Sequence, residues 1–452
     1  MAVVIQSYRF ALEPSPAQAE ALRSHCGAQR FAYNWGLDLI KVVMGQRAAE
    51  ASYGIGEEDL TPSLSWSAYS LRKLWNTVKD ELAPWWAENS KEAYSSGLAN
   101  LATALKNWRD SRKGKRKGAR VGFPQRKSRR HVMSCRFTTG SFGLADHDRR
   151  HVKLPRISLV RTHESTRKLA RHIERGTGRV PSATVSFRSG RWFVSFSVEI
   201  DRNEPPPRDP DGAVGVDLGI KSLAVLSTGE VIPNPRHLEL ALKELRRLQR
   251  QASRQTGPDT GRTPSKRWIK TQARITKLHG QIAQARLDGL HKLTTRLVRE
   301  FGTIVVEDLN VKGMMSNRRL ARHVAGIGMG EFRRQVEYKA AWSDVRVIIA
   351  NRWFASSKTC SGCGVVKAKL HLSERLFHCQ SCGLIIDRDL NAALNLAALV
   401  ERETSSASCA ARLNEPDGNP RKPTTRGHGY RHGKAPAHAG RGQRQSGNAL
   451  TQ

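Results

Sequence analysis

Acidic residues are scarce in this sequence. Its 452 residues contain 40 Asp and Glu against 76 Lys and Arg, which gives a formal net charge of +36. So large a positive charge opposes compaction unless a polyanion neutralises it, so nucleic acid is the first partner to expect and an anionic membrane surface the second. A hydrophobic content of 38% is sufficient for folding and argues against wholesale disorder.

Long hydrophobic runs and a disulfide framework are also missing. No apolar stretch approaches the roughly 18 residues of a membrane span, and the first residues lack the apolar run of a secretory signal. The seven cysteines include four in two CxxC pairs, which favours metal binding in a reducing compartment over disulfides. We therefore expect a cytoplasmic protein and exclude secreted, membrane and collagen-like classes.

The positive charge is concentrated in three segments. Residues 106–130 carry twelve Lys and Arg and one acid, residues 236–299 carry sixteen basic and four acidic residues, and residues 403–452 carry eight and three. One charge run is most often only a solvated face, but three runs that are each poor in acid favour binding to a nucleic-acid backbone. The last segment is rich in Gly, Pro, Arg and His, and we expect a basic disordered tail there.

The expected secondary structure changes along the chain. Residues 3–12 predict a strand, and a helical region follows a proline-containing turn and extends to about Trp108. After a basic, glycine-interrupted loop, alternating apolar residues predict a hairpin that turns at Ser189–Gly190. The proline-rich residues 203–211 predict a linker and a domain boundary. Beyond it the pattern is α/β, with buried strands and a long helical hairpin that breaks near Gly257–Pro258.

Two CxxC pairs give the strongest local signal. Cys360 and Cys363 are separated by fifteen residues from Cys379 and Cys382, a spacing that suits four thiolates around one tetrahedral Zn²⁺. Nearby glycines permit the tight turns that aim amide N–H groups at sulfur. Because four thiolates leave no open coordination position, we expect a structural zinc site. Unligated thiols or a redox pair are the less favoured alternatives.

Acidic residues beside buried segments form a second candidate site. Asp217 ends the run AVGV, Glu307 ends the run TIVV, and Asp387 and Asp389 precede a helix with one apolar stripe. Taken singly, such acids are most often strand terminators or helix N-caps. Strand ends and a helix N-terminus can converge at a sheet edge, however, where three carboxylates repel one another unless divalent cations lie between them. That setting is typical of two-metal phosphodiester cleavage.

An ATPase is the alternative for the first of these acids. The run from Asp217 to Gly219 after a buried strand also occurs in actin-like and sugar-kinase ATPases, which have a related core. Those proteins need a Gly/Thr-rich phosphate turn directly afterwards, but here Ile220 and Lys221 follow. The sequence has no second phosphate loop and no GxxxxGK[ST] motif, so ATPase activity is disfavoured.

Seven stretches of the chain together resemble the OrfB/TnpB family of insertion-sequence transposons, relatives of the type V CRISPR effectors. They occur in the family's order over about 396 of the residues, from Val4 to Leu399. The stretches are YRFALEPSPAQ (8–18), CGAQRFAYNWGL (26–37), GRWFVSFSVE (190–199), GVDLGIKSLAVLSTGE (215–230), VVEDLNVKGM (305–314), SSKTCSGCG (356–364) and FHCQSCGLIIDRDLNAALNLAAL (377–399).

The resemblance implies a multidomain protein of the α+β and α/β classes. It combines a wedge β-barrel and an inserted helical recognition lobe with a ribonuclease H-like RuvC nuclease domain that a zinc ribbon interrupts. The domains expected on this basis are a wedge strand (1–16), a helical recognition lobe with a basic loop (17–130), the wedge β-barrel and linker (131–211), the nuclease core with a helical hairpin insert (212–358), the zinc ribbon (359–384), the C-terminal nuclease helix (385–402) and the basic tail (403–452).

The activity implied by the resemblance is RNA-guided cleavage of DNA beside a short target-adjacent motif. Its partners would be a guide RNA from the transposon end and a double-stranded DNA target in the prokaryotic cytoplasm, and its cofactors a structural Zn²⁺ and a catalytic pair of Mg²⁺. Asp217, Glu307 and Asp389 match the three nuclease carboxylates. We select Asp389 because it precedes Asn391 as in the family's DxDxN pattern, with Asp387 as the alternative. The presence of all three acids argues against the nuclease-dead regulators that the family also contains.

The basic segments then predict a channel for an RNA–DNA heteroduplex, which is held by its backbone and shape while base pairing supplies the specificity. Aromatic residues near residue 33 could add stacking surface, although their helical spacing fits a helix core as well. A membrane surface is no longer expected, and a monomer and a weak dimer are both compatible with the sequence. The predicted nucleic-acid contacts are Arg30, Tyr33, Asn34, Lys113, Lys115, Arg116, Lys117, Arg126, Arg246 and Arg247.

Two other functions stay open at this point. A guide-dependent or simple DNA-binding protein would occlude sites without cutting, and the loss of any one of the three acids would have favoured it. The hypothesis of a transposase that itself joins DNA is less favoured, because the sequence has no tyrosine beside a His-x-His motif, which is typical of the partner recombinase.

Overall fold

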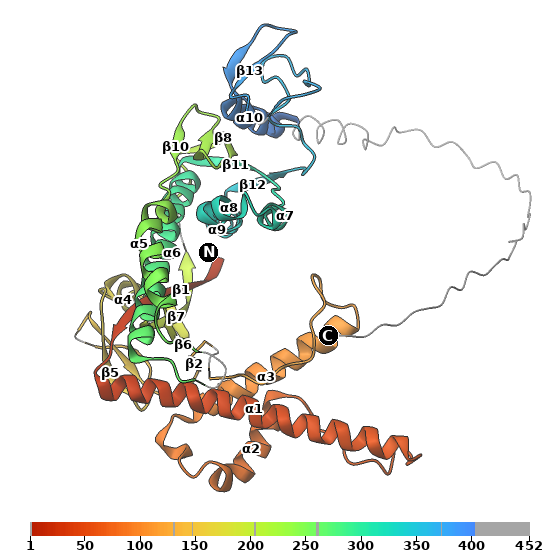
Figure 1. Cartoon of the computed structure of the whole chain (residues 1–452), viewed down its shortest axis with the longest axis vertical. Helices are drawn as coiled ribbons and strands as arrows, with labels where there is room; N and C mark the ends of the chain where they lie inside the picture. The colour runs from red at the N-terminus through yellow and green to blue at the C-terminus, as the bar shows by residue number, and fades with distance from the viewer. Residues whose placement is uncertain are drawn as a thin grey trace, which may run out of the picture. The chain divides into compact units, whose positions relative to one another are not determined.

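The computed structural model describes residues 2–129, 132–146, 148–202, 205–258, 262–371 and 373–402. They form a mixed α and β fold that contains a seven-stranded, a five-stranded and a two-stranded sheet (Figure 1). No helix in these ranges is both long and apolar enough to cross a membrane. The expected basic tail, residues 403–452, lies outside the described residues.

In the seven-stranded sheet, the N-terminal strand is antiparallel to both of its neighbours. β1 (Ala2–Glu13) pairs with β7 (Arg191–Arg202) on one side and β5 (Ser158–Thr162) on the other. The predicted hairpin is confirmed: Ser189 and Gly190 both have positive φ, which matches the twist of the flanking strands. The other elements of this region are β2 (Ser134–Phe137), β3 (Gly143–Leu144), β4 (His151–Leu154), α4 (Arg167–Glu174) and β6 (Gly178–Arg188).

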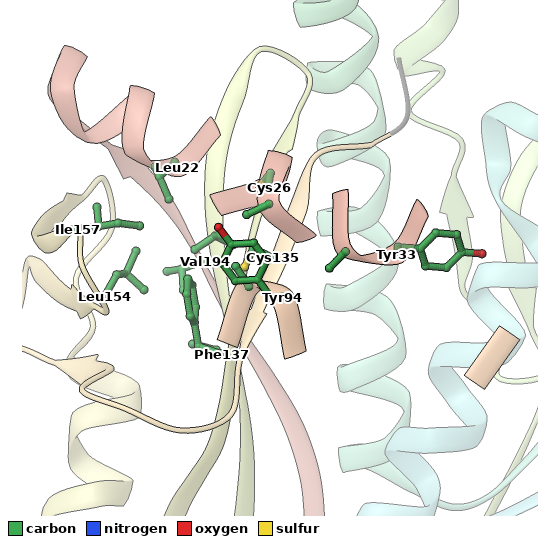
Figure 2. Close-up of a cluster of buried hydrophobic side chains, with 14 of the residues drawn as sticks. Leu22, Cys26, Tyr33, Tyr94, Cys135, Phe137, Leu154, Ile157 and Val194 are labelled. Carbon is green, nitrogen blue, oxygen red and sulfur yellow. The ribbon is translucent and has the colours of Figure 1, made fainter. Parts of the chain in front are cut away.

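Helices from the first quarter of the chain share one core with this sheet. α1 (Pro16–Ser52) begins at a capping box in which Ser15 and Gln18 bond each other's backbone N–H. It packs closely on α3 (Lys91–Arg112). Figure 2 shows Leu22 and Cys26 of α1, Tyr94 of α3, Phe137 of β2 and Val194 of β7 in one buried cluster. Two shorter helices, α2 (Ala68–Leu82) and the 3₁₀ turn η1 (Trp86–Glu88), complete the helical region.

The five-stranded sheet has the order β10-β9-β8-β11-β12. β8, β11 and β12 are parallel to one another, and β12 is the edge strand. β9 is antiparallel to both of its neighbours, β8 and β10. The parallel neighbours β8 and β11 both contain buried valine or isoleucine side chains, as expected for strands that are covered on two faces. The strands are β8 (Asp209–Asp217), β9 (Ser222–Leu226), β10 (Val231–Pro233), β11 (Phe301–Glu307) and β12 (Arg346–Ala350).

The predicted linker over residues 203–211 is too long at its C-terminal end. β8 begins at Asp209, which pairs with Phe301 at the start of β11. Pro210 is tolerated there because β9 pairs with β8 at Val216 and Asp217, and no described strand pairs with Pro210 on that side. The last three residues of the predicted linker are therefore part of β8.

The predicted helical hairpin is confirmed as α5 (His237–Ser253) and α6 (Lys266–Glu300), which lie side by side (Figure 1). A small apolar seam of Leu245, Leu248 and Ile275 joins them. The described segment between the two helices contains the expected break at Gly257 and Pro258. The remaining helices before the cysteine pairs are α7 (Val311–Ser316), α8 (Ala321–Ile327) and α9 (Met329–Trp342).

The last described helix, α10 (Arg388–Ala397), packs against β8 and follows the short hairpin of β13 (Leu376–His378) and β14 (Ile385–Asp387). The close approach depends on Gly215, because a Cβ at this position would overlap the carbonyl oxygen of Ala393. Glycine in the middle of β8 is therefore required by packing and not by a turn.

We expect Gly215→Ala to lower the free energy of unfolding by about 2 kcal/mol, because α10 must move off the sheet to make room for the methyl group. Gly289→Ala, within α6, is the matched control: apart from the backbone of its own helical turns, no atom lies within 4 Å of its added Cβ, so helix propensity should raise stability by up to about 1 kcal/mol. Urea denaturation of both variants measures the difference. Equal stabilities would contradict this account of the packing.

Candidate functional site

Two of the predicted carboxylates end neighbouring parallel strands. Val216 of β8 pairs with Val306 of β11, so Asp217 and Glu307 are the next residues on adjacent strands and leave the sheet at the same edge. Asp389 is the second residue of α10, the helix that packs on β8. The structure thus brings the three predicted acids into one neighbourhood, from segments up to 172 residues apart in the chain.

The electrostatics of Asp217 reflect this convergence. Its burial, followed by the negative charges of Glu307 and Asp389, raises the pKa of Asp217 to about 8. Arg388 opposes this rise, and Asp387 adds to it. An ionised Asp217 is therefore unfavourable without a cation, and oxygen ligands are the ones that Mg²⁺ prefers. By ligand chemistry these acids suit a divalent cation, but among the described residues they do not bring three ligand atoms within 4.8 Å of one another.

The two alternatives for the third acid have different tasks in the structure. Asp387 is the N-cap of α10, and its Oδ1 accepts hydrogen bonds from the backbone N–H groups of Asp389 (2.9 Å) and Leu390 (3.1 Å). One oxygen of Asp387 is therefore occupied by the helix terminus. This arrangement favours Asp389 as the third carboxylate.

Three side chains support the segments that carry these acids; the sequence used Asn391 only as part of a pattern and assigned no role to Ser356 or Asn395. Ser356 donates its hydroxyl hydrogen to Glu307 Oε1 at 2.6 Å. Asn395, buried in α10, donates to the backbone oxygens of Ser356 (2.8 Å) and Thr359 (2.6 Å). Asn391 donates to Thr359 O at 2.7 Å and accepts from the N–H of Ser361 at 2.9 Å. We call Asn391 and Asn395 the asparagine clasp. It joins the helix that carries Asp389 to the segment that orients Glu307.

The four predicted cysteines converge on one point. Their Sγ atoms all lie within 4.8 Å of one another, and in the part of the chain that the structure describes no other three or more potential ligand groups gather so closely. The Sγ–Sγ distances are 3.6 Å for Cys360–Cys382 and for Cys363–Cys379. A tetrahedron with Zn–S bonds of about 2.3 Å has edges of about 3.8 Å, so the cluster fits a zinc ion.

The two cysteine turns have the same backbone pattern. Gly364 and Gly383 follow the pairs with positive φ and donate to the carbonyl oxygens of Cys360 and Cys379, respectively. This is the tight turn that the sequence predicted around sulfur. Hydrogen bonds from the backbone of Cys382 and then Ser381 lower the pKa of the Cys379 thiol to about 6. A thiolate, the form that binds metal, is thereby favoured at Cys379, whereas hydrogen bonds with the other three thiols raise the pKa of Cys382 to about 12.

Comparison with known proteins decides the family. Three family models match in chain order: "Helix-turn-helix domain" of the OrfB type over residues 1–47, "Probable transposase" over 195–318 and "Cas12f1-like, TNB domain" over 330–396. The chain is 38% identical over 419 residues to the Mycobacterium tuberculosis (strain H37Rv) protein named "Putative RNA-guided DNA endonuclease Rv2885c", an alignment that covers 88% of this chain and 87% of that protein. The chain belongs to the OrfB/TnpB family.

A second relative agrees with the assignment to OrfB/TnpB. A Streptomyces pristinaespiralis protein that bears the same designation is 34% identical over 400 residues, covering 88% of this chain and 90% of that protein. Among solved structures, the Cas12f1–sgRNA–target DNA complex aligns with 87% of this chain and 99% of the Cas12f1 chain, at 13% identity and a TM-score of 0.47. In the described part of this stretch, residues 2–47 form β1 and most of α1, one continuous helix, and do not contain two helices around a turn.

The predicted nucleic-acid contacts of this OrfB/TnpB protein fall into three groups. Lys113, Lys115, Arg116 and Lys117 are exposed in the segment after α3, which contains neither helix nor strand. Arg246 and Arg247 are exposed on α5, where Arg247 pairs with Glu244 at 2.6 Å. The third group is made up of Arg30, Tyr33 and Asn34 on α1, together with Arg126.

Two members of the third group, Tyr33 and Asn34, contact the segment around Lys127 and hold it against α1. Asn34 accepts from the backbone N–H of Lys127 at 2.8 Å and donates to its carbonyl oxygen at 3.0 Å. The Lys127 ammonium lies 4.0 Å from the centroid of the Tyr33 ring, which is buried. Arg126, in contrast, is exposed and pairs with Asp38 at 2.8 Å. Tyr33 and Asn34 therefore act on the segment around Lys127, and their direct contact with nucleic acid stays a prediction.

Proposed function

We propose that this protein is an RNA-guided DNA endonuclease that cleaves phosphodiester bonds with Mg²⁺ at Asp217, Glu307 and Asp389. The observation that carries the proposal is the placement of the acids: Asp217 and Glu307 end neighbouring parallel strands, and Asp389 lies in the first turn of the helix that packs on β8. The relatives named as RNA-guided DNA endonucleases support the same activity for this chain.

The three acids would hold the catalytic cations. Divalent ions bound there would activate the attacking water and stabilise the leaving oxygen. Ser356 keeps one lone pair of Glu307 engaged and so limits the orientations of that carboxylate. The asparagine clasp holds Ser356 and α10 together, which fixes the position of Asp389 relative to Glu307.

The other parts of the chain would bind the nucleic acids. In this proposal the seven-stranded sheet with α4 is the wedge barrel, α1 to α3 are the recognition lobe, and the five-stranded sheet with its helices is the RuvC-like nuclease core. The cysteine cluster would bind a structural Zn²⁺ between β12 and α10. The exposed lysines and arginines of the segment after α3 and of α5 would contact the phosphates of guide RNA and target DNA.

Co-purification of RNA with the protein, followed by plasmid cleavage, tests the proposal. The protein should retain a discrete RNA through a high-salt wash and should cut a plasmid that carries a matching target in Mg²⁺ but not in EDTA. Absence of a bound RNA would contradict the guided mechanism. RNA-dependent target binding without cleavage would identify a site-occluding DNA-binding protein instead.

A further inference from the structure

An open cleft of about 870 Å³ lies between α1 and the basic segment at residues 126–129. Phe31, Trp35 and Trp85 form its aromatic side, and Arg30, Arg126 and Arg129 form its cationic side. Asp38 is the only acid among the lining residues that the structure describes. The volume falls within the range of about 300–1,000 Å³ that is typical of small-ligand sites.

The aromatic side is rigid but accessible. The Phe31 and Trp85 rings meet nearly edge-on, with centroids 5.5 Å apart. Phe31 and Trp35 also pack edge-on against the buried ring of Trp75, at 6.0 and 5.3 Å. Trp85 nevertheless keeps 38% of its surface exposed. A ring that is fixed by its neighbours and still exposed can stack on a ligand at little entropic cost.

The cationic side is fixed by the bonds between Asn34 and the Lys127 backbone described above. These bonds fix the backbone beside Arg126 and Arg129, which line the cleft together with the aromatic rings. Arg126 remains 64% exposed in its side chain despite the ion pair with Asp38, so it can also reach an anionic ligand.

We propose that this cleft binds an unpaired nucleotide of single-stranded nucleic acid, with the base against Trp85 and Phe31 and its phosphates at Arg126 and Arg129. The inference rests on the proposed nucleic-acid function and specifies what this part of the protein recognises. A duplex presents phosphates but keeps its base faces stacked, so it would leave the aromatic side unused. An unpaired nucleotide uses both sides of the cleft.

Binding of short oligonucleotides to the full chain, freed of nucleic acid by nuclease treatment followed by heparin chromatography, tests the inference. Fluorescence anisotropy is measured with a 12-nucleotide RNA, the DNA of the same sequence and the blunt DNA duplex, each at several salt concentrations. We expect Trp85→Ala to weaken single-strand binding about tenfold and to leave duplex binding unchanged. The slope of log affinity against log salt concentration should also stay unchanged. Arg126→Ala should instead reduce the magnitude of this slope by about one, as expected for the loss of one phosphate contact.

Two variants control for misfolding and for the loss of any exposed tryptophan. Trp353, 87% exposed between β12 and the cysteine pairs, lies outside the cleft, so Trp353→Ala should bind as wild type does. Trp85→Phe keeps an aromatic ring and should retain single-strand affinity, while it removes part of the tryptophan quenching that RNA or DNA causes. That quenching difference is measurable even if Trp85→Ala does not fold.

A weakened RNA complex would identify guide RNA as the occupant, and a weakened DNA complex would identify a target strand; either supports the inference. Equal weakening of single-strand and duplex binding by Trp85→Ala, or no quenching difference in Trp85→Phe, would overturn it. The assay involves no cleavage. A protein that binds single strands in this cleft but cuts no DNA would therefore refute the proposed function and leave this inference standing.

Discussion

Replacing Asp217 by asparagine should reduce guided DNA cleavage by about 1,000-fold or more, while RNA and target binding are retained. The substitution removes the carboxylate at the centre of the acidic neighbourhood, and with it the charge that would hold a catalytic cation. Asparagine has the same shape, and the neighbouring acids Glu307 and Asp389 already disfavour a charge at this position. In metal-free buffer the variant should therefore unfold at the same temperature as wild type or a higher one.

Plasmid cleavage, RNA content and target binding by gel shift are measured together for this variant. Asp288→Asn is the matched control, since Asp288 is an exposed acid on α6 that pairs with Lys292 at 2.7 Å. It should cut as wild type does. Unchanged cleavage by Asp217→Asn would show that the carboxylate site is assigned wrongly, whereas loss of RNA or target binding would show that Asp217 has a structural role.

Cys360→Ser should abolish the retention of one zinc ion per chain. Cys360 is buried, and its sulfur is one of four that gather within 4.8 Å. With three sulfur ligands left, the metal loses a bond, and the apolar cluster around Phe377 in the hairpin of β13 and β14 is small among the described residues. Local unfolding of residues 359–384 should follow, seen as faster amide exchange and as proteolytic cleavage there.

The zinc content of purified protein, measured by mass spectrometry, checks this expectation, and a chelator should reproduce the exchange pattern in wild type. Cys26→Ala is the control because Cys26 is a buried thiol in the core of α1, remote in sequence from the cysteine pairs. It should retain zinc. Wild-type protein that contains no zinc, or Cys360→Ser protein that contains one ion per chain, would contradict the assignment.

Local sequence patterns predicted much of this architecture. Short apolar runs located β8 and β11 because parallel strands are buried on both faces, and their last residues, Asp217 and Glu307, then had to meet at one sheet edge. CxxC spacing located the cysteine cluster, because each pair forms its turn within five residues. The β6–β7 hairpin was predictable for the same reason: its alternation and its turn are adjacent in sequence.

Long-range contacts explain what sequence reasoning missed. Ser356 bonds Glu307 across 49 residues, and Asn395 reaches Thr359 across 36. Neither pattern differs locally from an ordinary serine in a loop or an asparagine on a helix. The roles of Tyr33 and Asn34 were also hidden, because they depend on a segment 93 residues away folding back on α1.

The asparagine clasp has a consequence for exchanging parts between relatives. The first cysteine pair is bonded through Thr359 and Ser361 to Asn391 and Asn395, which lie beyond the second pair on α10. If residues 359–384 alone were transplanted into a relative, they would lack Asn391 and Asn395, whose hydrogen bonds connect this segment to α10. The smallest segment that carries both cysteine turns and the clasp extends from Ser356 through α10, so chimeric proteins should be joined outside those limits.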